Sequence, residues 1–78
     1  MREKKLWLII TFHTTTAAMA MESLCTEKGL PGRLIPVPRE ITAGCGMSWR
    51  APAENKKELI EAAEQAGIAT DGAYEIVI

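Results

Sequence analysis

The hydrophobic positions of the chain fall into short segments that predict alternating strands and helices. The first segment, Leu6 to Phe12, is apolar at nearly every position, which is typical of a central strand covered on both faces. Shorter runs predict three more strands, at residues 33–38, 47–51 and 74–78. Between the strands, helix-forming residues predict two helices, at 17–28 and 52–66.

Local signals predict where the helices begin and end. The threonines that follow His13 offer N-cap hydroxyls to the first helix. Each helix is followed by a glycine and an apolar residue, Gly29 with Leu30 and Gly67 with Ile68, which is a common helix end. We expect the buried stripe of the first helix to contain Ala17, Met21, Leu24 and Lys28, with Ala20 beside it, and that of the second to contain Leu59, Ile60, Ala63 and Ala66.

The order strand–helix–strand–strand–helix–strand favours one architecture. Two strand–helix halves with right-handed crossovers build the ferredoxin-like βαββαβ fold, an α+β two-layer sandwich. Its antiparallel sheet has the order 4-1-3-2, with the first and third strands central and both helices on one face. Pro36 and Pro38 fit an edge strand, because proline cannot donate a ladder hydrogen bond. We therefore predict this fold as a single domain over residues 1–78.

Composition and charge exclude several classes of function. The 78 residues have a net charge of -1 and a pI of about 5.8, so the charge balance predicts no nucleic-acid or membrane partner. The apolar run at 6–10 is too short to span a bilayer, and we expect a cytoplasmic protein. The two cysteines form no CxxC motif or zinc-ligand pattern, so we expect free thiols and no metal site.

The candidate chemistry lies in the loop after the second predicted strand, where Cys45 stands between Gly44 and Gly46. Glycines leave the sulfur unshielded and tolerate positive φ angles. Because the first and second strands of this fold run parallel, the loop is expected at the end of the first strand. That placement brings Cys45 near His13, Thr14, Thr15, Thr16 and Arg39. A helix N-terminus, a nearby cation and free N–H groups all favour a thiolate or a bound anion.

Each of these residues can also have a purely structural role. A cysteine between glycines can be a small turn residue, a single histidine can lie on the surface, and the threonines are first of all a helix cap. Cys25, within the first helix, is expected to pack rather than react. Trp7 and Trp49 are expected to fill or cover the core.

Three segments carry a resemblance to a known family. They are residues 10–20, residues 29–41 with the run Pro36-Val37-Pro38-Arg39-Glu40-Ile41, and Cys45-Gly46 followed by Trp49-Arg50. Through these segments nearly the whole chain resembles the small bacterial domains called Putative Se/S carrier protein-like. The proline-rich run followed by Cys-Gly is the most specific part. In some selenium-metabolism proteins, members of this family are attached to a TusA-like sulfur-carrier domain.

The resemblance implies a sulfur or selenium carrier in which Cys45 accepts the atom as a persulfide or perselenide. The groups that would stabilise its charge are Arg39, His13, Thr14, Thr15, Thr16, Gly44 and Gly46. Such a protein is a carrier rather than a self-sufficient enzyme, and it has no cofactor other than the atom it carries. It would work with a cysteine or selenocysteine desulfurase-type donor and an acceptor protein, as a monomer or a homo-oligomer.

Two other hypotheses remain open. The chain could be a non-catalytic binding or regulatory module that holds an anionic ligand or a protein partner at loop 39–46, with Cys45 incidental. A thiol peroxidase or another redox enzyme is less favoured, because no resolving cysteine lies close to Cys45 in the sequence.

Overall fold

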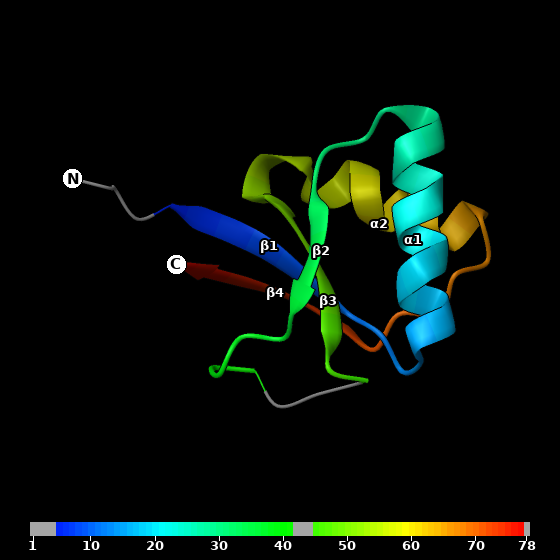
Figure 1. The fold of residues 1–78 in the computed structure, drawn as a ribbon. Coiled ribbons are helices and arrows are strands. Elements are labelled where there is room, and N and C mark those ends of the chain that lie inside the picture. Colours follow the sequence, from blue (N-terminus) through cyan, green and yellow to red (C-terminus); the bar gives the residue numbers. More distant parts are fainter. Residues whose placement is uncertain (1–4, 42–44, 78) are drawn as a thin grey trace.

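The computed structural model describes residues 5–41 and 45–77, which form a sheet and two helices (Figure 1). The elements in chain order are β1 (Leu6–Thr11), α1 (Thr15–Lys28), β2 (Arg33–Pro36), β3 (Met47–Pro52), the 3₁₀ turn η1 (Ala53–Asn55), α2 (Lys56–Gln65) and β4 (Gly72–Val77). The sheet has the order β2-β3-β1-β4, and each neighbouring pair is antiparallel. The predicted ferredoxin-like fold and its strand order are therefore confirmed.

One face of the sheet and both helices enclose the core. Alternate residues of β1 and the residue after it, Leu8, Ile10 and Phe12, are at most 1% exposed and share one buried cluster with residues of both helices. The helical members of this cluster are Ala18, Met21, Cys25, Leu59 and Ala63. Since these helical residues meet the same side of β1, both helices lie on one face of the sheet, as predicted.

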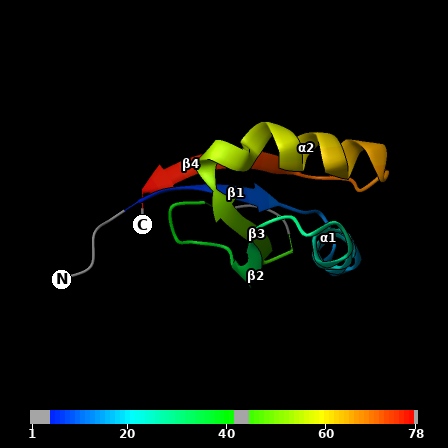
Figure 2. The ribbon, with the colours of Figure 1, turned by 90° about the horizontal axis from the view of Figure 1, so that it is seen from above.

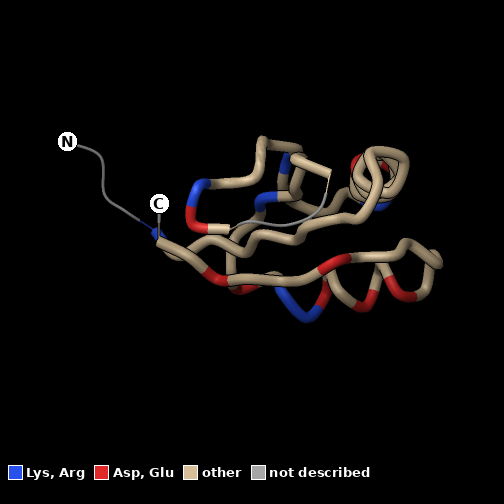
Figure 3. The backbone as a smooth tube through the Cα atoms, turned by 90° about the horizontal axis from the view of Figure 1, so that it is seen from below, with Lys and Arg blue, Asp and Glu red and all other residues tan. Residues whose placement is uncertain are grey.

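The other face of the sheet, which we call the outer face, is partly covered by the loop between β2 and β3. Ile9 and Thr11 point away from the helices and are nevertheless 0% exposed. Ile41 of the loop is 7% exposed, and the loop passes on the opposite side of β1 from α2 (Figures 2 and 3). Segment 37–41 thus lies on the outer side of the sheet, where Ile9 and Thr11 are buried, in keeping with a β1 that is apolar on both faces.

The ends of α1 follow the predicted signals, whereas its buried stripe differs from the prediction. The Thr14 side chain caps the helix by accepting a hydrogen bond from Ala17 N at 3.1 Å, and Gly29 ends it with φ of 70°. The buried residues are Ala18, Met21 and Cys25, whereas Lys28 and Ala20 are exposed. Met21 is buried as predicted, and Ala17 and Leu24 are partly buried against the core, so the buried face is centred on Ala18, Met21 and Cys25 instead.

Several predicted boundaries, and one predicted burial, are wrong. Pro52 ends β3 instead of starting a helix, and the turn η1 separates it from α2, which begins at Lys56. Strand β2 ends at Pro36, because the chain leaves the sheet toward the loop there. In α2 only Leu59 and Ala63 are buried, and Ala66, predicted to be buried, is exposed at the C-cap.

Candidate functional site

Cys45 lies at the end of the sheet where β1 leads into α1. Its backbone N–H donates to the carbonyl oxygen of Phe12 at 2.9 Å. The next residue, Gly46, accepts a hydrogen bond from Val37 N, also at 2.9 Å, so both limbs of the loop are tied together. The side chain of Cys45 is half-buried and packs against the edge of the core. The backbone pairing therefore holds the thiol beside the end of β1, where the sequence predicted it.

Gly46 gives this turn its shape. Its φ is 95°, a conformation that residues with a side chain rarely adopt. Apart from its two chain neighbours, no described residue has an atom within 4 Å of the position that a Cβ would occupy at Gly46. Gly44, the other glycine predicted to expose the sulfur, lies outside the described residues.

The sulfur atom of Cys45 has one polar contact among the described residues. Its Sγ donates a long hydrogen bond, of 3.9 Å, to the carbonyl oxygen of Met47. A carbonyl oxygen can accept a hydrogen bond from the neutral thiol, but it has no hydrogen to donate to a thiolate. Groups that favour an anion must therefore come from the surroundings of the turn rather than from this contact.

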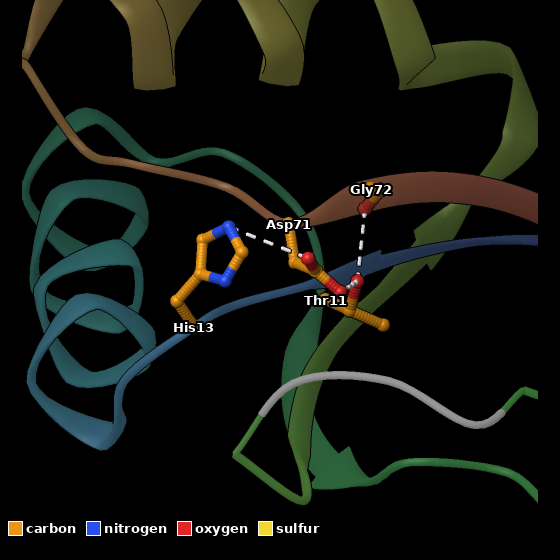
Figure 4. Close-up of polar contacts among 4 residues, drawn as sticks. All are labelled: Thr11, His13, Asp71 and Gly72. Carbon is orange, nitrogen blue, oxygen red and sulfur yellow. Dashed lines mark hydrogen bonds and ion pairs between the residues drawn. The ribbon is translucent and has the colours of Figure 1, made fainter.

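His13 follows the end of β1 and is paired with a residue that the sequence analysis did not single out as functional. Its Nε2 lies 3.3 Å from Oδ1 of Asp71, at the start of β4 (Figure 4). The other carboxylate oxygen of Asp71 is 3.3 Å from the Thr11 hydroxyl, and Asp71 N donates to Thr11 O at 2.7 Å. His13 is 64% exposed at its side chain and Asp71 only 23%, so a largely shielded carboxylate orients an accessible imidazole.

The pairing of β4 with β1 is the signal that could have identified Asp71. In the predicted strand order, the start of β4 lies opposite the end of β1, and the structure pairs Gly72 with Thr11. An aspartate directly before that position is therefore expected near the residues that follow β1. The sequence analysis interpreted Asp71 and Gly72 only as a turn.

The other predicted site residues lie in two separate places. Thr14 is the N-cap of α1, and Thr15 and Thr16 are exposed in its first turn, close along the chain to the Phe12 carbonyl that holds Cys45. Arg39 is exposed in segment 37–41, which extends away from α1 in Figures 1 and 2. Within residues 5–41 and 45–77, no hydrogen bond or ion pair joins Arg39 to the thiol.

Cys25 differs from Cys45 in every respect that affects reactivity. It is 1% exposed, lies inside α1 and belongs to the central core cluster. Burial raises the pKa of its thiol from the ordinary value of 9.0 to about 11. The prediction that Cys25 packs in the core is confirmed.

Comparison with known proteins gives the family of the chain. The family model described as Putative Se/S carrier protein-like matches residues 8–75, which include both cysteines and the whole Cys45 turn. The chain belongs to this family. No curated protein and no solved structure matches it.

Membership of the Se/S carrier-like family gives the site its chemical context. The family name refers to the transport of selenium or sulfur, a role that requires partner proteins. In the part of the chain that the structure describes, no group of His, Cys, Asp or Glu side chains is arranged to hold a metal ion. None of the described helices has the length and apolar character needed to cross a membrane.

The buried thiol of Cys25 predicts a loss of stability in alkali. The pKa of this thiol is higher in the folded than in the unfolded chain, so the unfolded chain loses its proton first as the pH rises. The contribution of the neutral thiol to the free energy of unfolding is therefore complete below about pH 9 and is lost as the pH rises toward 11. The expected loss over this range is about 2–3 kcal/mol of unfolding free energy. Urea denaturation of wild type and Cys25→Ala across this pH range measures it. The variant, although less stable at neutral pH, should lack this part of the alkaline decrease, and equal decreases in both proteins would contradict the prediction.

Proposed function

We propose that this protein carries a sulfur or selenium atom covalently on Cys45. The observation that supports the proposal most is the contrast between the two cysteines. Cys45 is half-buried in a turn with open space at Gly46, whereas Cys25 is enclosed in the core. A carrier must present the terminal atom first to a donor and then to an acceptor, and a cysteine on a surface loop of a compact domain meets that need.

The transfer requires neither an oxidant nor a cofactor. The thiolate of Cys45 attacks the terminal sulfur of a donor enzyme's cysteine persulfide, and its electron pair forms a new S–S bond. The old S–S bond of the donor breaks, and the donor cysteine leaves as a thiolate. Cys45 then carries the persulfide, and an acceptor thiolate takes the atom in the same way, returning Cys45 to its thiolate. Loading with selenium follows the same sequence through an S–Se bond.

The surroundings of Cys45 supply groups that can stabilise the anion. The first turn of α1, with Thr15 and Thr16, presents the positive end of the helix dipole near the end of β1. His13, oriented by Asp71, can accept the thiol proton or donate to a bound anion. The proposed set also includes the N–H group of Gly46, that of Gly44, which lies outside the described residues, and the charge of Arg39, which lies farther along the same loop.

The proposed partners are a cysteine or selenocysteine desulfurase in the cytoplasm and an acceptor protein. The direct test is intact-mass analysis of the purified protein after incubation with a desulfurase and either cysteine or selenocysteine. A carrier gains the mass of one sulfur or one selenium atom, and a thiol reductant removes it. A chain that gains no mass with either amino acid would favour the binding-module hypothesis, in which Cys45 is incidental.

The pair His13 and Asp71 is expected to affect the rate of loading. In Asp71→Asn the amide keeps the size of the side chain but removes the charge that orients the imidazole, and His13→Gln removes the imidazole itself. We expect both variants to load several-fold more slowly than wild type and to reach the same final mass. Ser23→Ala, an exposed substitution on α1 outside the proposed set, is the control for a general effect of a surface change. Loading of both variants at the wild-type rate would remove the pair from the mechanism.

A further inference from the structure

The outer face of the sheet places two arginines directly opposite each other. Arg33 of β2 pairs in register with Arg50 of β3, and Arg50 pairs in turn with Ile9 of β1. Residues paired in this way point to the same side, and Ile9 points away from the helices. Like charges facing each other on neighbouring strands destabilise a sheet, so folding alone does not account for this pair.

The guanidinium of Arg50 is held in position but not neutralised. It lies over the indole ring of Trp7, with its central carbon 4.3 Å from the ring centroid. Its Nε is buried, and within residues 5–41 and 45–77 no acceptor bonds to it. The same described residues contain one ion pair, between His13 and Asp71, so it involves neither arginine. A stacked guanidinium of this kind has a fixed direction and keeps its terminal N–H groups for an external anion.

More positive charge gathers around this pair. The Lys5 ammonium lies 4.9 Å from the centroid of the same Trp7 ring, and Arg39 is exposed on the loop that crosses the outer face. Most of the carboxylates lie elsewhere, along the exposed side of η1 and α2 at Glu54, Glu58, Glu61 and Glu64, although Glu40 follows Arg39 on the loop. Figure 3 shows basic segments on β2, β3 and the loop, where one acidic residue follows the basic one, and most of the acidic segments along α2 and β4, where α2 also carries a basic segment. The protein therefore has a basic surface although its net charge is -1.

We propose that Arg33 and Arg50, with Trp7 beneath Arg50, form a docking site for an acidic segment of a partner protein, whose carboxylates bind the two guanidinium groups. A carboxylate matches the planar fork of arginine, and two adjacent arginines match two carboxylates on a short stretch of chain. A nucleic acid is less suited, because it binds extended rows of cations, whereas this site offers one pair of adjacent arginines. The proposal concerns a different surface from Cys45 and does not depend on the carrier function.

The position of the site relates it to the thiol. Arg50 is three residues along β3 from Met47, about 10 Å at the rise of a strand, and the Cys45 turn immediately precedes Met47. A partner bound to the arginine pair would therefore extend easily to the end of the sheet that carries Cys45. The site would select partners with acidic segments and hold them beside the reactive group.

Fluorescence anisotropy with a labelled peptide of consecutive glutamates tests the proposal, with a glutamine peptide of the same length and a single-stranded oligothymidylate as competing probes. Wild type should bind the glutamate peptide more tightly than either of the others, and added salt should weaken binding. Arg33→Gln and Arg50→Gln should each raise Kd about tenfold. Lys57→Gln, an equal charge change at an exposed position of α2, should leave Kd unchanged.

Thermal unfolding and self-association measurements distinguish a docking site from a folding defect and from a contact between two copies of the chain. Arg33→Gln removes one of two facing like charges at an exposed position, so its thermal midpoint should not fall, and loss of binding then cannot be attributed to unfolding. Cys45→Ser should bind the peptide like wild type, which distinguishes failure of this proposal from failure of the carrier function.

Three results of the binding experiment would overturn the docking proposal: equal weakening by Lys57→Gln, tighter binding of the oligothymidylate, or unchanged binding in both arginine variants. So would concentration-dependent self-association lost in Arg33→Gln, which would mean that the acidic α2 of a second copy occupies the site.

Discussion

Cys45→Ser is expected to abolish loading with sulfur or selenium completely while the fold remains intact. Serine keeps the approximate size of cysteine, but its oxygen cannot form the S–S or S–Se bond on which the proposed transfer depends. The backbone hydrogen bond from residue 45 to Phe12 and the open turn at Gly46 do not require sulfur. Intact mass after incubation with a desulfurase measures the loading, and circular dichroism with thermal unfolding measures the fold.

Cys25→Ser is the matched control, because it removes the same atom from the same chain at a buried position. We expect it to gain one sulfur or selenium atom as wild type does, although a buried hydroxyl lowers its stability. Labelling with iodoacetamide near neutral pH should give the same order, with Cys45 modified much faster than Cys25, whose pKa is raised to about 11 by burial. If Cys45→Ser still gained mass, or if Cys25 were alkylated as fast as Cys45, the assignment of Cys45 would be wrong.

Gly32→Ala is expected to have the largest effect on stability. Gly32 has a φ of 125°, and a Cβ at this position would overlap Trp49 Nε1 and lie 2.6 Å from the backbone oxygen of Arg50. The indole N–H of Trp49 donates to Pro31 O at 3.2 Å, so the ring cannot move aside without losing that bond. Backbone strain and overlap together should cost on the order of 3 kcal/mol of unfolding free energy. For a domain of this size the thermal midpoint should fall by more than about 10 °C.

Gly67→Ala separates the two contributions to this effect. Gly67 also has a positive φ, of 73°, but no described atom lies within 4 Å of the position of an added Cβ. It should therefore lose only the conformational contribution, about 1 kcal/mol. Equal losses of unfolding free energy in Gly32→Ala and Gly67→Ala would show that the backbone conformation accounts for the whole effect. The Trp49 ring would then move aside at no cost in stability.

The structure also accounts for a feature that composition conceals. The chain is nearly neutral overall, and that balance predicted neither a nucleic-acid nor a membrane partner. Folding sorts the charges, because the two faces of the sheet are built from alternate residues and the outer residues of α2 all face solvent. The pairing of Arg33 with Arg50 depends on register between strands, which no single stretch of sequence displays.

The sequence by itself was sufficient to determine the fold and the family. The apolar β1, the prolines near β2 and the glycines after both helices each limit the local backbone, and together they admit one strand order. They also placed Cys45 at the end of β1, because parallel placement of β1 and β2 follows from that order. Periodicity was insufficient where two stripes had equal spacing, as in α1, or where a proline suited both a strand end and a helix start, as at Pro52.

Only the tertiary structure decided which side chains meet across the ends and faces of the sheet. The contact of His13 with Asp71 joins residues from opposite ends of the chain, and the stacking of Arg50 on Trp7 joins β3 to β1. These contacts depend on strand register and on rotamers, both of which arise from packing rather than from local preference. The different positions of the two thiols, one within α1 and one in a glycine turn, were predicted from the sequence, whereas the extent to which each is buried was decided by the packing.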